Sequence, residues 1–168
     1  MLLPEAPLPE WSGIDVPLYR TVTATFRWKS DESRACDYDR ACDVSDYAGV
    51  ITVGFGEGLV LNDAPCTTAW LATRSGGILA RWEYADTDSA MESALASIPD
   101  GLRWEPKGVF SIVGSPQVLF NSGEPGVEPL QPRMTLQIPV GDYDVLWARL
   151  APDPATAAGL IQLRNINV

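Results

Sequence analysis

The densest group of chemically capable side chains lies between residues 36 and 43. Thiols and carboxylates crowd this segment, in the order Cys36-Asp37-Tyr38-Asp39-Arg40-Ala41-Cys42-Asp43. An EF-hand calcium loop counted from Asp37 would need Gly at its sixth position and Glu at its twelfth, where this chain has Cys42 and Ala48. A structural zinc site commonly uses two close ligand pairs, whereas the third cysteine, Cys66, is remote. The segment matches neither metal site.

Other catalytic patterns are missing as well. The sequence contains no histidine, which removes His-based triads, His general bases and His-containing zinc sites. Paired carboxylates can hydrolyse glycosides, but any acidic chain holds such pairs. The Gly-rich stretch 54–58 lacks the Lys-Ser/Thr ending of a phosphate-binding loop, and a strand pattern follows it. We therefore expect no enzymatic activity, no metal and no cofactor.

Tryptophans are the strongest candidates for packing or contact. The chain has six. Trp82 and Trp147 fall at matching positions of an apparent internal repeat, which favours the core. Trp11 and Trp104 lie in segments rich in Gly and Pro, where an exposed Trp can anchor an interface.

The elements that position these side chains are mostly strands. Gly and Pro number 14 each and cut the chain into short pieces, which favours strands over long helices. Apolar residues alternate with polar ones over 18–28, as in a half-buried strand. The opening 4–17 is predicted as an irregular arm, and the acidic stretch 29–48 as a long loop or a short helical turn. Further strands are predicted at 50–53, 58–61, 67–72, 78–84, 109–113, 117–120, 134–138, 143–150 and 161–168, the first two of them paired as a hairpin.

One clear helix interrupts the strands, near 88–98. Met91, Ala94, Leu95 and Ile98 recur at helical spacing, and Ser89 with Glu92 has the spacing of a capping box. Residues 153–159, rich in Ala, are compatible with a second, short helix. The predicted fold class is therefore mainly β (α+β).

An internal repeat organises these elements. Residues 49–53 correspond to 108–112, and 59–62 match 118–121 at the same offset. After an insertion, the pattern of 78–82 returns at 143–147. We predict two similar antiparallel β modules, over about 49–98 and 108–160, packed as one domain spanning 1–168 because neither would bury its apolar face alone.

The net charge of the chain indicates which classes of binding partner to expect. Lys and Arg total 12 and Asp and Glu total 22, a net charge of −10. Nucleic acids and anionic membranes attract positive potential, so neither is an expected partner. A basic protein partner is compatible with this charge, and so is simple solubility in a bacterial cytosol.

Sequence features also bear on location. Three cysteines form no paired framework and fit reduced thiols. The start, Met1 to Glu5, lacks the basic and apolar regions of a signal peptide, and no apolar run reaches the ~20 residues of a membrane span. We therefore expect a cytoplasmic protein.

Several motifs resemble one family, immunity protein 21 of bacterial polymorphic toxin systems. Trp11-Ser12-Gly13 is similar to its WxG element, and residues 37–54 are similar to its acidic DYDRAC segment with the Gly-Val-Ile strand that follows. The segments 59–61, 67–71 and 76–86 keep the family order, and 141–145 resembles a later Gly-x-Tyr-x-Val strand. The resemblance spans about 8–165, with most weight on 36–86.

The resemblance implies a cytoplasmic protein that neutralises a cognate toxin by direct binding, and it implies no catalytic residues. Asp37, Tyr38, Asp39 and Asp43 are the predicted contacts with a toxin, a basic one on the charge argument, and Trp11 is a candidate anchor.

A structural role for the same acidic segment is equally open. Asp37 or Asp39 would then pair with Arg40 or Arg81 and hold the loop on the sheet. The alternative function is a binding module for a protein other than a toxin, such as an effector chaperone or scaffold. An enzyme using carboxylates alone is a third class.

Overall fold

The computed structural model describes residues 1–13, 37–61, 66–127 and 132–167. The chain divides into two compact units, which we call unit 1 (Met1–Asn62 and Ser111–Val140) and unit 2 (Asp63–Phe110 and Gly141–Val168). The described residues form two antiparallel five-stranded sheets and two α-helices, so the predicted mainly β class is confirmed. The prediction of a single domain spanning 1–168 concerns how the units join, and it stays a prediction.

The sheet of unit 1 is built around a strand that the sequence patterns did not indicate. Its spatial order is β2 (Ala48–Val53), β3 (Gly56–Leu61), β1 (Leu2–Pro4), β7 (Gln117–Leu119) and β8 (Met134–Leu136). The central strand β1 pairs antiparallel with both β3 and β7, and Leu2 lies opposite Leu59 and Leu119. Residues 2–4 thus form a strand, and Pro4 belongs to it rather than to the irregular arm predicted for 4–17.

The predicted hairpin is confirmed as β2 and β3, which pair in register from Ala48–Leu61 to Val53–Gly56. The turn needs a residue in the left-handed region, and Gly54 adopts it with φ +55°. Alternation then directs Val53, Ile51 and Val60 to one face.

That face carries the core of unit 1. The short helix α1 (Asp37–Cys42) and the 3-10 turn η1 (Leu8–Glu10) supply side chains to it. The buried members are Met1, Leu3, Leu8, Trp11, Ala41, Val53, Val60, Val118 and Phe120. The acidic stretch was predicted as a loop or a short helical turn, and α1 is such a turn.

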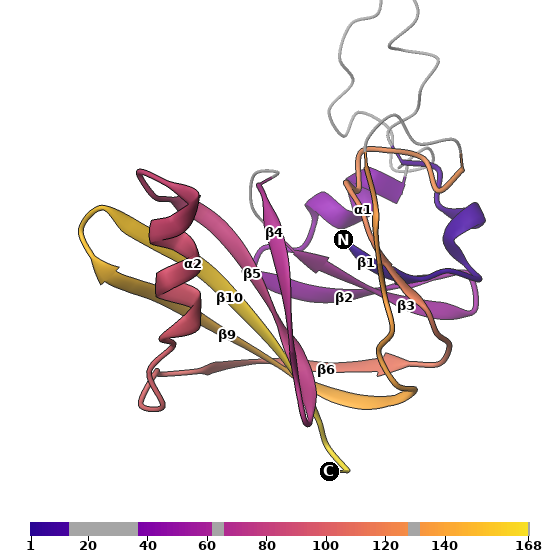
Figure 1. Ribbon diagram of the computed structural model, residues 1–168. Coiled ribbons are helices and arrows are strands. Elements are labelled where there is room, and N and C mark those ends of the chain that lie inside the picture. The colour runs from indigo at the N-terminus through magenta and orange to yellow at the C-terminus, as the bar shows by residue number, and fades with distance from the viewer. Residues whose placement is uncertain (14–36, 62–65, 128–131, 168) are drawn as a thin grey trace, which may run out of the picture. The chain divides into compact units, whose positions relative to one another are not determined.

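Unit 2 contains the longer strands. The sheet order is β4 (Thr68–Thr73), β5 (Gly76–Tyr84), β10 (Thr156–Asn165), β9 (Gly141–Asp153) and β6 (Glu105–Ile112). The helix α2 (Asp88–Ala96) lies across one face of this sheet (Figure 1). Its Met91 and Ala94 pack with Ile78, Ala80 and Leu160. This is the helix predicted near 88–98.

The capping of α2 differs from the prediction. Thr87, and not Ser89, is the N-cap, and its side-chain oxygen accepts a hydrogen bond from Ala90 N at 3.1 Å. Ser89 lies inside the first turn, where its carbonyl accepts from Ser93 Oγ at 2.8 Å. The helix begins two residues earlier than the Ser89–Glu92 spacing indicated.

The short helix considered for 153–159 is wrong. These residues form the end of β9, a turn and the start of β10. Asp153 Oδ1 accepts a hydrogen bond from Ala155 N at 2.8 Å, which stabilises the turn. Ala158 then pairs with Trp82 and Leu150 on the two neighbouring strands. Cross-strand pairing therefore overrides the helix propensity of the alanines.

Both repeat segments contribute strands to both sheets. Residues 49–98 provide β2 and β3 to unit 1 and β4 and β5 to unit 2, while 108–160 provide β7 and β8 to unit 1 and β9 and β10 to unit 2. The proposed match of 49–53 with 108–112 equates β2 with β6, which belong to different sheets. The duplication itself stays a prediction.

Two further predictions concern single segments. The strand predicted at 18–28 lies outside the described residues. None of the helices in the described part of the chain has the length and apolar character needed to cross a membrane.

Candidate functional site

The acidic helix α1 is the centre of the candidate site. It has six residues, and helices this short are unstable in water without tertiary contacts. Ala41 is 3% exposed and packs in the core of unit 1, with Val44 against the same cluster. This leaves the polar side chains of the helix to fix its orientation.

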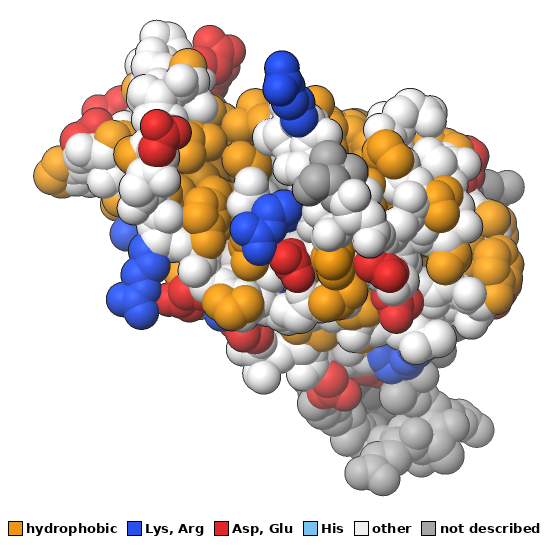
Figure 2. Space-filling model, turned by 90° about the horizontal axis from the view of Figure 1, so that it is seen from below, with side chains coloured by type: hydrophobic (Ala, Val, Ile, Leu, Met, Phe, Trp, Pro, Cys, Tyr) orange, Lys and Arg blue, Asp and Glu red, His pale blue; other side chains and the backbone are white. Residues whose placement is uncertain are grey.

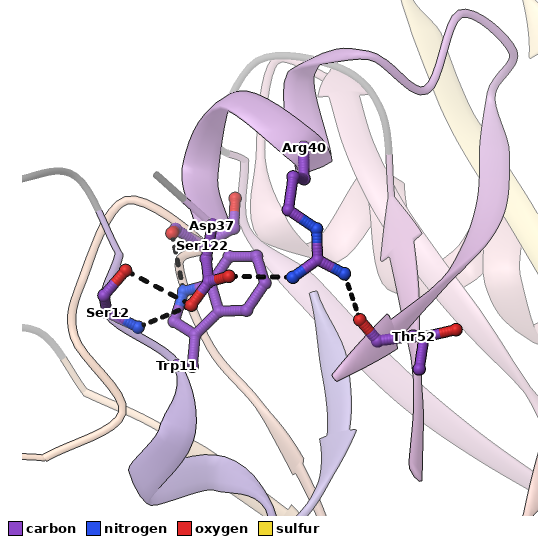
Figure 3. Close-up of polar contacts among 6 residues, drawn as sticks. All are labelled: Trp11, Ser12, Asp37, Arg40, Thr52 and Ser122. Carbon is purple, nitrogen blue, oxygen red and sulfur yellow. Dashed lines mark hydrogen bonds and ion pairs between the residues drawn. The ribbon is translucent and has the colours of Figure 1, made fainter. Parts of the chain in front are cut away.

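Asp37 accepts several of the hydrogen bonds that fix the orientation of α1. Its Oδ2 accepts hydrogen bonds from Ser12 N at 2.9 Å and from Ser12 Oγ at 3.2 Å. Its Oδ1 accepts from Arg40 Nη1 at 2.9 Å, which is also an ion pair (Figure 3). A carboxylate in the first turn is also favoured by the helix dipole. Asp37 therefore joins the N-terminal arm to α1.

Arg40 extends this network to the sheet. Its Nη2 donates to the carbonyl oxygen of Thr52 in β2 (Figure 3). We call the set Ser12, Asp37, Arg40 and Thr52 the polar clamp. The structural hypothesis was that an aspartate of the acidic segment pairs with an arginine and holds the segment on the sheet. Asp37 fits this hypothesis, because the Asp37–Arg40 pair holds α1 against β2.

The prediction of Trp11 as an exposed anchor is wrong. Its side chain is 1% exposed and meets the Phe120 ring edge-on, with centroids 6.3 Å apart. The indole Nε1 donates to Ser122 O at 3.0 Å (Figure 3). The WxG element therefore contributes a core side chain whose one polar group is satisfied, and Trp11 is not available as an exposed anchor.

The remaining predicted contact residues lie nearer the surface. Tyr38 and Asp39 are half-buried, and Asp43 is exposed just beyond the end of α1. Asp39 and Asp43 are four residues apart, with Asp43 N bonded to Asp39 O at 3.0 Å, so they share one side of the helical turn. The structure thus separates Asp37 from Asp39 and Asp43.

An aromatic residue that sequence reasoning missed extends this surface. Tyr47 is 50% exposed, and its backbone N donates to Asp46 Oδ1 at 2.7 Å. Its position between an acidic segment and the buried start of β2 was the available signal. We call Asp39, Asp43, Asp46 and Tyr47 the acidic surface of unit 1.

The acid balance differs between the units. The described residues of unit 1 carry eight Asp and Glu side chains and two Arg, whereas those of unit 2 carry nine acids and six Lys or Arg. Figure 2 shows acidic side chains standing among exposed hydrophobic ones on the face it presents. Unit 1 is therefore the more negative unit, and its potential attracts cationic surfaces.

The acidic surface has the composition of a contact site. Among the described residues, no group of three or more Cys, Asp or Glu is arranged to hold a metal ion. Cys42 is exposed and Cys66 half-buried, both as free thiols. What the arrangement offers is carboxylates and a phenol on a clamped support, which suits recognition of a cationic protein.

The structure thus combines a mainly β fold with an acidic surface on a short helical turn that the polar clamp holds. The family model of Immunity protein 21 matches residues 1–156 of 168. The chain belongs to the Immunity protein 21 family, as its motifs indicated. No curated protein and no solved structure matches it.

Proposed function

We propose that this protein binds and neutralises a cognate polymorphic toxin in the bacterial cytoplasm, by direct contact and without catalysis. Membership of the Immunity protein 21 family is the observation that carries the proposal. The acidic surface of unit 1 is the part of the molecule that we assign to the toxin. Its expected partner is a cationic surface of the toxin domain.

The electrostatics of unit 1 support this assignment. Asp39, half-buried in α1, and Asp43, exposed just beyond its end, lie on one side of a helical turn that the polar clamp holds in place. Charges at the rim of an interface accelerate association more than they slow dissociation. Tyr47 adds an exposed aromatic ring, a residue type enriched in interface hot spots. A stable complex would bury roughly 1,600 Å² in total, so this surface is one part of a larger interface.

The test begins with co-expression of the chain and the C-terminal domain encoded by the adjacent gene. We expect the wild-type chain to restore growth and to co-purify with that domain. The charge-reversal variant D39K/D43K should lower the association rate about tenfold at low salt, and by less at high salt because salt screens exposed charges.

A matched control is available in unit 2. Asp88 and Glu92 are also four residues apart and exposed on a helix, so D88K/E92K changes the net charge equally. Binding at the wild-type rate by this control, with slow binding by D39K/D43K, supports the assignment. Equal slowing by both variants would mean that net charge alone acts and would contradict the assigned surface.

The alternative function is tested in the same experiment. A chaperone or scaffold for a secreted effector would co-purify with its partner without relieving toxicity. Binding without growth rescue would therefore replace the immunity function with the alternative one.

A further inference from the structure

A second exposed surface of unit 1 lies at the tip of the β2–β3 hairpin. Phe55 occupies the turn and is 69% exposed. Val113, 55% exposed, lies nearby: a Cβ added at Gly56 would be 3.7 Å from Val113 Cγ2 and 3.5 Å from Pro7 Cγ. Single exposed hydrophobic residues are common, so Phe55 alone would indicate little. Phe55 differs from such residues because a charged group lies close to its turn.

That group is the carboxylate of Glu10. It lies over the turn, because a Cβ added at Gly54 would be 2.8 Å from Glu10 Oε1. Glu10 is an exposed residue of η1. Within the described ranges, no cation pairs with Glu10, and no ring or cation lies against Phe55. An exposed carboxylate therefore lies against Gly54, the turn residue next to the exposed Phe55.

Unit 2 contains a similar pair, a glutamate and a tyrosine, with a cation in place, and there the tyrosine hydroxyl also accepts a hydrogen bond from that cation. Arg149 Nε donates to Glu83 Oε2 at 2.8 Å, and its guanidinium carbon lies 5.9 Å from the centre of the Tyr84 ring. Hydrogen bonds to Glu83 and to Tyr84 raise the pKa of Arg149 above its usual value. An acid beside an aromatic ring thus binds a guanidinium in this fold.

Unit 1 has no spare cation to serve Phe55 and Glu10 among its described residues. Arg40 is engaged by Asp37 and Thr52 in the polar clamp. Arg133 donates to Pro125 O and Gly126 O and lies 5.5 Å from the centre of the Phe120 ring. The described residues of unit 1 therefore leave this pair open to a cation from another molecule, and the negative balance of unit 1 favours the approach of such a cation.

We propose that Phe55 and Glu10 form a binding site for an arginine side chain of the toxin. The guanidinium stacks on the Phe55 ring and donates hydrogen bonds to the Glu10 carboxylate. Arginine is preferred to lysine because its planar group combines stacking with a paired hydrogen bond to a carboxylate. This inference rests on the proposed function and names the chemistry of the partner at a second point of the same interface.

The test measures binding of the purified toxin domain encoded by the adjacent gene to variants of the intact chain. F55A should weaken binding at least tenfold and E10Q about fivefold. The double variant F55A/E10Q should weaken binding by less than the product of these factors, because both groups contact one arginine. F55W should retain binding, since tryptophan offers a better face for a cation.

Two controls separate this site from general effects. Y84A removes an exposed aromatic residue from unit 2 and should leave toxin binding unchanged. Thermal unfolding of F55A should match the wild type, because the side chain is exposed. Replacing the contacted toxin arginine by lysine should reproduce the loss seen with F55A.

The outcomes distinguish the two proposals. A wild-type chain that neither binds the toxin domain nor restores growth overturns the proposed function. A wild-type chain that binds, together with F55A and E10Q variants that bind equally well, overturns only the arginine site. The arginine site is also contradicted if the affinity losses of the two single variants multiply in the double variant. Two groups that contact the same cation would not act independently.

Discussion

Units 1 and 2 have similar parts that are held together in different ways. Each has a five-stranded sheet with a helix against one face. In unit 2 the nine-residue α2 is fixed by apolar side chains, with Met91 and Ala94 buried. In unit 1 the six-residue α1 buries Ala41 and relies on the polar clamp. Short helices bury too little apolar surface to hold themselves, so charged hydrogen bonds complete the attachment.

The acids of the segment that contains α1 also differ in how they are placed. Asp37 faces inward to the clamp, with 19% of its side chain exposed, while Asp43 is exposed to solvent. The structural hypothesis for the segment therefore fits Asp37, whereas toxin contact by Asp39 and Asp43 stays a prediction. The following changes test this comparison, from the largest expected effect to the smallest.

The largest effect is expected for W11A. Removing a buried Trp that contacts Phe120 and bonds to Ser122 O should destabilise unit 1 by about 4 kcal/mol. Hydrogen exchange should show faster opening of β1, β3 and β7. Preserved protection of these strands would show that the WxG tryptophan is not the core residue described for unit 1.

In unit 2 the corresponding change is M91A. Met91 is 4% exposed, and truncating a buried Met typically costs about 3 kcal/mol. Hydrogen exchange should report the loss at α2 and β10, because these elements share the apolar core. A loss confined to the helix ends would indicate that capping, rather than apolar packing, holds α2.

The polar clamp is tested by D37A. This change leaves Ser12 N–H without its acceptor and Arg40 without its ion-pair partner, so we expect a loss of about 2 kcal/mol. The matched variant E5A, at an exposed acid of the same unit, should change the free energy of unfolding by less than about 0.5 kcal/mol. Equal effects in chemical denaturation would remove the distinction between inward and outward acids.

The smallest expected effect concerns the cap of α2. T87A should destabilise unit 2 by about 1 kcal/mol because Ala90 N–H loses its acceptor. S89A should be nearly neutral, since Ser89 lies inside the helix. A larger loss for S89A in thermal unfolding would restore the capping box expected from the sequence.

Elements specified by local pattern could be predicted. The β2–β3 hairpin follows from alternating apolar residues around a glycine turn, and α2 follows from apolar residues at helical spacing. The acidic DYDRAC segment was recognised as a special region, and it does form a helical turn at the surface. The patterns that specify the hairpin and α2 lie within a few residues along the chain, whereas α1 is held by the polar clamp, whose residues are distant in the sequence.

The amino-acid sequence by itself determined the mainly β class, the acidic balance, the hairpin, the helix and the family. The tertiary structure alone decided that β1 is a central strand, that 153–159 is a strand turn, and that Trp11 is buried. It also split the acids between clamp and surface. The physical reason is distance along the chain: Asp37 meets Ser12 across 25 residues and Trp11 meets Ser122 across 111. Local propensities carry no information about partners that far away.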